Sequence, residues 1–138
     1  MAGSLSAEEV ARVAEFRAAL RRFLRTTERN AQAAGLTPQR YLLLLMIKGT
    51  PDLSEQSTVT ELSDRLQLAQ STVTELVSRA EESGLVERER SPADGRIAHL
   101  RLSAEGERRL AQAFTSNESE RRALQEAFEH FEGRVLTA

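Results

Sequence analysis

The segment from Thr58 to Gly106 constrains the fold more than any other part of the chain. Two short helical patterns, TVTELSDRL and QSTVTELVSRAEES, are followed by a glycine at position 84. Two strand-like stretches, LVERER and RIAHLRL, then flank a turn that runs from Ser91 to Arg96. This order of two helices, a glycine stop and a β hairpin predicts a helix-turn-helix followed by a β wing.

Capping signals support both helices of this segment. Thr58-Val59-Thr60-Glu61 fits a capping box at the start of the first helix. In the second helix, Val73, Leu76, Val77 and Ala80 recur on one side, and Gly84 stands where a left-handed C-terminal cap is needed. We therefore expect both helices to bury one face and to expose the other.

Two helices are predicted before this segment. Ser6-Ala7-Glu8-Glu9 is a capping box for a long first helix, from about Ala7 to Ala34, which closes near Gly35. Thr37-Pro38 then begins a helix whose stretch from Tyr41 to Ile47 is apolar all round, so it is expected in the middle of the fold. The residues from Gly49 to Ser57 are predicted to form the main internal loop.

The C-terminal part admits two interpretations. Ser103 caps a further helix, which we predict to run from about Ala104 to Arg134 with a weak point at residues 115–117. Alternatively, two helices meet there, with Ser116 or Asn117 as the second cap. The resulting fold class is mainly α with a small β wing: a dimerisation helix in 1–35, a winged helix-turn-helix in 36–102, and a C-terminal dimerisation helix in 103–138.

Composition limits the function more than it defines it. The chain has 138 residues, no cysteine and a formal net charge of −2. It shows no targeting segment and no apolar run long enough for a membrane span, so we expect a cytoplasmic protein without a membrane partner. Acidic residues also outnumber arginines within the winged segment, so any DNA contact must depend on a few well-placed groups rather than on a basic face.

The outer face of the second helix in the winged segment has the chemistry of a DNA-reading surface. Short polar side chains let a helix approach the major groove and bond to bases or phosphates. The face offers Gln70, Ser71, Thr72, Thr74, Glu75, Ser78 and Arg79. A solvated polar face would have the same composition, and the wing that follows is what favours DNA.

The wing tip, Asp94-Gly95-Arg96, suits insertion into the narrow, electronegative minor groove. Arg96 supplies the planar cation, and Asp94 is expected to hold that arginine or to cap the turn. An ordinary Asp-Gly hairpin with a surface arginine is the alternative.

No catalytic residue, metal site or cofactor is predicted. His99 and His130 lie far apart and lack acidic or histidine neighbours at metal-ligand spacing. The chain also has no nucleophile elbow, P-loop or dinucleotide fingerprint. We therefore do not expect an enzyme.

The long terminal helices favour a two-fold homodimer. They are more than a small domain needs to cover itself, although packing on their own domain is the alternative. A dimer would present two recognition helices to successive major grooves, which implies a pseudo-palindromic site on double-stranded DNA.

The chain resembles the MarR family of winged-helix transcription regulators. The resemblance is carried by LTPQRYLLLL (residues 36–45), TELSDRLQLAQSTVTELVSRAEESGLVERE (60–89), the tip Asp94-Gly95-Arg96 and LSAEG (102–106). It implies an obligate dimer built on the terminal helices that acts as a repressor. It also implies a small aromatic or phenolic effector, which binds between the dimer region and the winged domain and releases DNA.

The resemblance also suggests individual site residues. Recognition-helix positions fall on Gln70, Ser71, Thr72, Thr74 and Arg79, wing positions near the DNA backbone on Arg88 and Arg90, and the wing-tip pair on Asp94 and Arg96. For the effector, Arg17, Arg40 and Tyr41 on the first two helices are the candidates.

Three features depart from the family pattern. Glu75 places a carboxylate on the recognition helix, where it repels phosphate unless it accepts from a cytosine amine. Ala69 replaces the usual serine cap, and the chain stops soon after Val135, so the last helix is expected to be missing or the one before it truncated. The acidic balance supports an alternative function, a winged-helix protein-interaction module without strong DNA binding.

Overall fold

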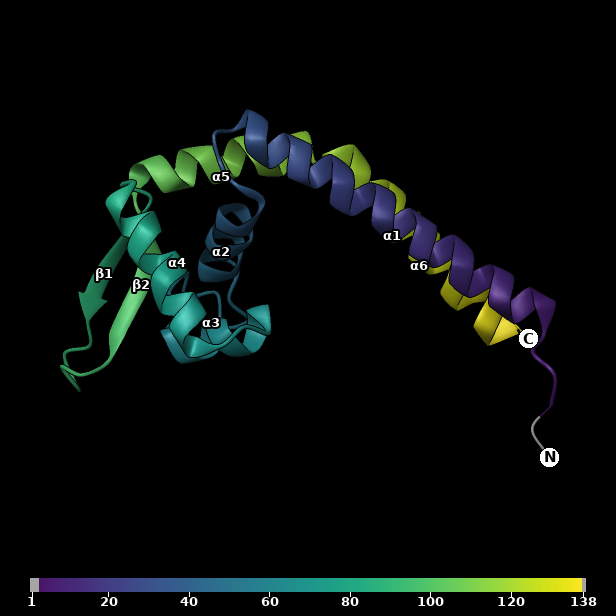
Figure 1. Cartoon of the computed structure of the whole chain (residues 1–138), viewed down its shortest axis with the longest axis horizontal. Coiled ribbons are helices and arrows are strands. Elements are labelled where there is room, and N and C mark those ends of the chain that lie inside the picture. Colours follow the sequence, from purple (N-terminus) through teal and green to yellow (C-terminus); the bar gives the residue numbers. More distant parts are fainter. Residues whose placement is uncertain (1–2, 138) are drawn as a thin grey trace.

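A computed structural model describes residues 3–137 of the chain, and the side chains of residues 3–131. The ends of the predicted terminal segments, residues 1–2 and 138, lie outside it. The elements are, in order, α1 (Ala7–Ala33), α2 (Pro38–Lys48), α3 (Val59–Leu66), α4 (Gln70–Glu82), β1 (Val86–Arg90), β2 (Ala98–Leu102), α5 (Ala104–Ser116) and α6 (Glu118–Thr137). Figure 1 shows a winged body of α2, α3, α4 and the hairpin beneath α5, with α1 and α6 side by side as a long arm. The predicted winged helix-turn-helix is confirmed.

The predicted helix ends are set by local hydrogen bonds. The hydroxyls of Ser6, Thr37 and Ser103 each accept from a backbone N–H in the first turn of the helix they precede. Thr58 and Glu61 form the complete reciprocal capping box of α3. Gly84 has a φ of +73°, the left-handed conformation expected after α4. These caps are local features, which is why the sequence predicted them.

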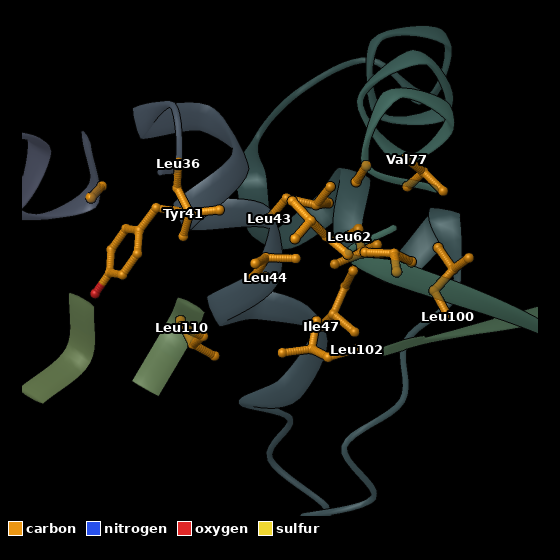
Figure 2. Packing of buried hydrophobic residues seen from close by; sticks show 14 of the residues in the cluster. Leu36, Tyr41, Leu43, Leu44, Ile47, Leu62, Val77, Leu100, Leu102 and Leu110 are labelled. Carbon is orange, nitrogen blue, oxygen red and sulfur yellow. The ribbon is translucent and has the colours of Figure 1, made fainter. Parts of the chain in front are cut away.

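The core forms around α2, as the apolar run predicted. Leu43, Leu44 and Ile47 are fully buried, and they pack with residues of the neighbouring elements, among them Leu62, Val77, Leu100 and Leu110 (Figure 2). The expectation of burial on all sides was wrong at Leu42, which is 42% exposed, and Leu45 and Met46 are only partly buried. α2 therefore packs against both the winged body and α5 and leaves Leu42 at the surface.

The wing is a two-stranded antiparallel sheet with an unexpected addition at its base. β1 and β2 pair from Val86–Leu102 at the base to Arg90–Ala98 near the tip. Ser57, predicted as the end of a loop, forms an isolated bridge to Leu100, with N···O distances of 3.0 and 2.8 Å. The hairpin is thereby fixed to the segment that leads into α3.

The continuous C-terminal helix that we predicted was wrong, and the alternative with a break holds. α5 ends at Ser116, and Asn117 is its C-cap with φ −89° and ψ 0°. The Asn117 side chain is 1% exposed because it turns inward between α1 and α2. α6 then extends over 20 residues, so the expectation of a missing last helix was also wrong.

Over most of their length the terminal helices pack on each other, and only the C-terminal end of α1, around Ala31, joins the core of the winged body. Phe16 of α1 lies 6.0 Å from Phe128 and 5.5 Å from Phe131 of α6, measured between ring centroids. Val10, Val13 and Phe128 are nevertheless about half exposed. The arm therefore keeps an apolar surface that its own chain does not cover.

Candidate nucleic-acid interface

Helix α4 is anchored on one side and open on the other. Val73, Val77 and Ala80 are completely buried against the core. The opposite side exposes all the predicted recognition positions, which are Gln70, Ser71, Thr72, Thr74 and Arg79, together with Glu75. The polar residues that the sequence suggested therefore share one accessible face.

The start of α4 lacks a side-chain cap. Ala69 makes no capping hydrogen bond, so it offers no acceptor to the first-turn N–H groups. Gln70 Nε2 instead donates to Thr60 Oγ1 of α3 over 3.5 Å, which links the two helices at their exposed ends. Backbone N–H groups at an uncapped helix start are natural donors to a phosphate.

Glu75 and Arg79 form an ion pair on the exposed face of α4. The distance from Arg79 Nη2 to Glu75 Oε1 is 2.7 Å, and the two residues are one helical turn apart. The carboxylate holds the guanidinium along the helix and neutralises it locally. Arg79 is therefore not a free cation, a constraint that the sequence analysis did not foresee.

The wing tip holds Arg96 in an extended position. Asp94 Oδ1 accepts from the Arg96 backbone N–H at 3.0 Å and from Arg96 Nε at 3.3 Å. The Ile97 N–H donates to the Asp94 carbonyl, which closes the turn. The Arg96 side chain is nevertheless 92% exposed. Asp94 thus orients the base of this side chain and leaves the far edge of the guanidinium open.

The other two predicted wing arginines brace the hairpin. Arg90 Nη1 donates to the Gly95 carbonyl at 2.6 Å, across the tip. Arg88 Nη2 lies 2.7 Å from Glu81 Oε1 of α4, and hydrogen bonding to this carboxylate raises the pKa of the Arg88 guanidinium above its ordinary value. Arg88 therefore fixes the wing relative to α4, whereas Arg90 stabilises the tip of the hairpin.

The three effector candidates are not brought together. Arg17 is exposed on α1, Arg40 is half-buried, and Tyr41 is buried with its hydroxyl bonded to Asn117. A cavity of about 400 Å³ lies elsewhere, between the end of α2, the 49–57 loop and α5, and none of the three residues lines it.

Sequence reasoning missed the ionic cluster at this cavity. Lys48 Nζ lies 3.0 Å from Glu55 Oε1 and 2.8 Å from Glu107 Oε2. Lys48 is the single lysine of the chain, but that is a weak signal in a sequence with so many arginines. The partner Glu107 is remote in sequence and could not be assigned without the fold.

Within residues 3–137, no helix has the length and apolar character needed to cross a bilayer. Over the same part of the chain, no three His, Asp or Glu side chains gather as they would around a metal ion.

The anchored α4 and the braced hairpin define a winged helix-turn-helix protein with paired terminal helices. Comparison with known proteins places it more closely: the chain belongs to the MarR family, whose model matches residues 34–97. An uncharacterised HTH-type transcriptional regulator of Bacillus subtilis, YsmB, is 34% identical over 93 residues, which are 67% of this chain and 61% of that protein. The chain spans 52–61% of the length of the curated relatives it matches, all transcriptional regulators by name.

Solved structures share the fold. AbsC, a MarR family regulator from Streptomyces coelicolor, matches with a TM-score of 0.71 at 19% identity, over 91% of this chain and 84% of its own. Sco3205 from the same organism, solved in complex with DNA, matches with a TM-score of 0.70 at 24% identity, over 97% and 92%. At these identities the likeness establishes the fold alone.

Proposed function

We propose that this protein is a sequence-specific, DNA-binding transcription regulator that acts as a homodimer on a pseudo-palindromic operator. The observation that carries the proposal is the placement of Arg96. Its side chain is 92% exposed at the wing tip although Asp94 holds its Nε. The hairpin runs beside α4 (Figure 1), whose polar residues are exposed. A recognition helix and an adjacent extended arginine can address the major and minor grooves of one duplex.

The two parts have different roles in this proposal. Gln70, Ser71, Thr72, Thr74 and Arg79 face the major groove, where short polar side chains contact both bases and phosphates. Arg96 enters the flanking minor groove. Asp94 already restricts the rotamers of Arg96, so the arginine loses less side-chain entropy when it binds DNA. Arg88 keeps the wing at its angle to α4, Arg90 stabilises the hairpin tip, and both lie beside the DNA backbone.

Dimerisation is assigned to the terminal segments, 1–35 and 103–138. The apolar surface around Val10, Val13 and Phe128 is the part of the arm that a second copy would cover. In a two-fold dimer the recognition helices would contact half-sites about one helical turn apart, roughly 34–36 Å. The winged domain, 36–102, would then be the reading head of each subunit.

We further propose repression relieved by a small effector. Support comes from the cavity beside Lys48, because this cavity lies where the winged body meets α5. A ligand at this junction can favour one orientation of the reading heads over another, and so change the affinity for DNA. None of the earlier candidates, Arg17, Arg40 and Tyr41, lines this cavity, and Tyr41 contributes only by joining α2 to Asn117 at the end of α5.

Arg96→Ala tests the proposal most directly. The DNA flanking the gene is titrated with protein at two salt concentrations, and binding is followed by fluorescence anisotropy. We expect a loss of affinity of about fivefold or more, because an arginine that makes a good contact to DNA contributes on the order of 1–3 kcal/mol. Arg122→Ala removes an exposed arginine from α6 and serves as the matched control, with affinity unchanged. Equal affinities for the two variants would contradict the wing assignment.

A protein-interaction module is the second candidate, favoured by the net charge of −2 and by Glu75 on the recognition face. The salt dependence of binding separates the two functions. A DNA regulator loses affinity steeply as salt rises, because each phosphate contact releases counterions. Binding that stays weak for every sequence and insensitive to salt would favour the protein-interaction module.

A further inference from the structure

The cavity beside Lys48 has the size and walls of a small-molecule site. Its volume is about 400 Å³, and Leu45, Leu110, Ala111 and Phe114 form its apolar wall. Sites for small ligands commonly span roughly 300–1,000 Å³ and combine apolar walls with a few polar groups. Here the polar groups are gathered at one side, where Lys48 meets Glu55 and Glu107.

The charge at that side is unbalanced. Lys48 Nζ contacts one oxygen of Glu55 and both oxygens of Glu107, at 2.8–3.0 Å. These contacts occupy the three donors of the ammonium group, and hydrogen bonding to Glu107 and then to Glu55 raises the pKa of Lys48 above its ordinary value. Two carboxylates thus face one cation, and lone pairs on both remain open.

Three neighbouring guanidinium groups lie outside the cavity lining and have other partners. Arg101 shares an adjoining hollow with Glu55 and Glu107, but its Nη1 lies 3.3 Å from Glu89 Oε2 on β1. Arg121 stacks on the Phe114 ring, with Cζ 3.7 Å from the ring centroid, and donates to the Phe114 carbonyl. Arg65 donates to the carbonyls of Met46 and Gly49 at 2.9 and 2.8 Å. None of these three residues lines the cavity.

The backbone is strained at Leu53 and Glu55, which form part of the rim of the cavity. Leu53 and Glu55 adopt left-handed backbone conformations, with φ of 61° and 60°, which side chains other than glycine rarely take. Leu53 also lines the cavity while 84% of it is exposed. An apolar side chain held in this way gains burial when a ligand fills the space beneath it.

We propose that this cavity binds a small hydrophobic amine in its cationic form. The hydrophobic part of the ligand would lie against Leu110 and Phe114, and its ammonium group beside Glu55 and Glu107. The inference rests on the proposed function, of which it specifies the effector. An aromatic carboxylate, by contrast, would have to displace a glutamate from Lys48 and leave that carboxylate unpaired. Because Glu55 precedes α3 and Glu107 belongs to α5, the bound cation would connect the reading head to α5.

Three ligands of similar shape test the charge preference. The full-length protein is titrated by calorimetry at pH 7 with 4-tert-butylbenzylamine, the corresponding benzyl alcohol and 4-tert-butylbenzoate. We expect the amine to bind at least tenfold more tightly than the benzoate, with the alcohol in between. Equal or tighter binding of the benzoate, or no binding of any of the three, would overturn the inference.

Variants locate the site. Glu107→Gln, which breaks the ion pair with Lys48, should weaken amine binding at least fivefold and remove the preference over the alcohol. Glu118→Gln on α6, which breaks an ion pair with Arg122 instead, should leave the affinity for the amine and this preference unchanged. Ala111→Trp fills the cavity from an exposed position and should abolish binding of all three ligands. If Glu107→Gln lowers the thermal stability, the result for Ala111→Trp alone decides whether the ligand binds in this cavity.

Amine binding that survives Ala111→Trp would place the ligand elsewhere and refute the inference. A change of oligomeric state in Ala111→Trp would assign the cavity to a second copy of the chain and refute it equally. DNA affinity of the wild type without ligand is measured in parallel. If the protein binds DNA but does not prefer the amine over the benzoate, only the present inference is contradicted. If it does not bind DNA, the proposed function is contradicted.

Discussion

The side-chain amide of Asn117 donates a hydrogen bond to the Tyr41 hydroxyl across 3.2 Å, inside the protein. Its carbonyl oxygen accepts from Asn30 Nδ2 of α1 at 2.7 Å. A single buried residue at the break between α5 and α6 therefore connects the arm to α2. Buried polar groups of this kind are costly when a partner is lost, so the connection gives the break a fixed geometry.

Tyr41→Phe should destabilise the protein by about 1–3 kcal/mol, because it leaves the buried Asn117 amide without its acceptor. Urea denaturation at a fixed protein concentration measures the change, since the stability of the proposed dimer would depend on concentration. Ser116→Ala removes an exposed hydroxyl that bonds to the Gln112 carbonyl, and should cost much less. Identical midpoints for Tyr41→Phe and the wild type would mean that the Asn117–Tyr41 bond contributes nothing.

Gly106→Ala should destabilise the fold even though alanine is the better helix former. A Cβ at this position would lie 2.1 Å from the Leu85 carbonyl oxygen, which is backbone and cannot move aside. The helix propensity gain is about 1 kcal/mol, whereas the clash forces α5 away from the start of β1. We expect a net loss of about 2 kcal/mol, seen as a lower denaturation midpoint.

Gly95→Ala is the matched control for that substitution. A Cβ on Gly95 would meet nothing within 4 Å, so its thermal stability should change little. If Gly106→Ala were as stable as Gly95→Ala, the close approach of α5 to Leu85 would not be real.

Glu75→Gln should strengthen DNA binding. The substitution removes a carboxylate from the recognition face and frees Arg79, which is held at 2.7 Å in the wild type. The slope of log affinity against log salt should steepen by about one phosphate contact, roughly 0.9. Arg79→Ala should weaken binding, and the double variant shows whether the gain passes through Arg79. A Glu75→Gln variant that binds DNA less well would point instead to direct contact of Glu75 with a base.

Glu105 makes stability depend on pH at the start of α5. Hydrogen bonds from Arg108 and then Arg109 lower its pKa to about 2 from 4.5. Because the folded-state pKa is depressed, the stabilisation is complete above about 4.5 and is lost as pH falls towards 2. Glu105→Gln should therefore lower the melting temperature slightly at pH 7, and the difference should shrink between pH 4.5 and the acid limit.

Glu8 provides the comparison for Glu105, since it holds the same place in the first turn of α1, two residues after the N-cap Ser6. Glu8→Gln should lower the melting temperature at pH 7 by less than Glu105→Gln does, because it is Glu105 that forms the ion pairs with Arg108 and Arg109. A Glu105→Gln deficit that stayed constant with pH would show that charge is not its cause.

Local chemistry determined much of this protein from the sequence alone. Several features depend on residues within a few positions of one another in the chain. They are the caps at Thr37, Thr58 and Ser103, the glycine stop at Gly84 and the burial of α2. The same holds for the open face of α4 and the Asp94–Arg96 tip, which a helical period and a short turn are enough to place.

Contacts between distant residues were decided only by the tertiary structure. The break at Asn117 exists because its side chain is drawn to Asn30 and Tyr41, some eighty positions away. The sequence showed a weak helical stretch there, but propensity cannot choose between a kink and a break. Likewise, Lys48 meets Glu107 only because α2 packs on α5. Helices and turns are specified by neighbours in the chain, whereas breaks, ion clusters and cavities are specified by neighbours in space.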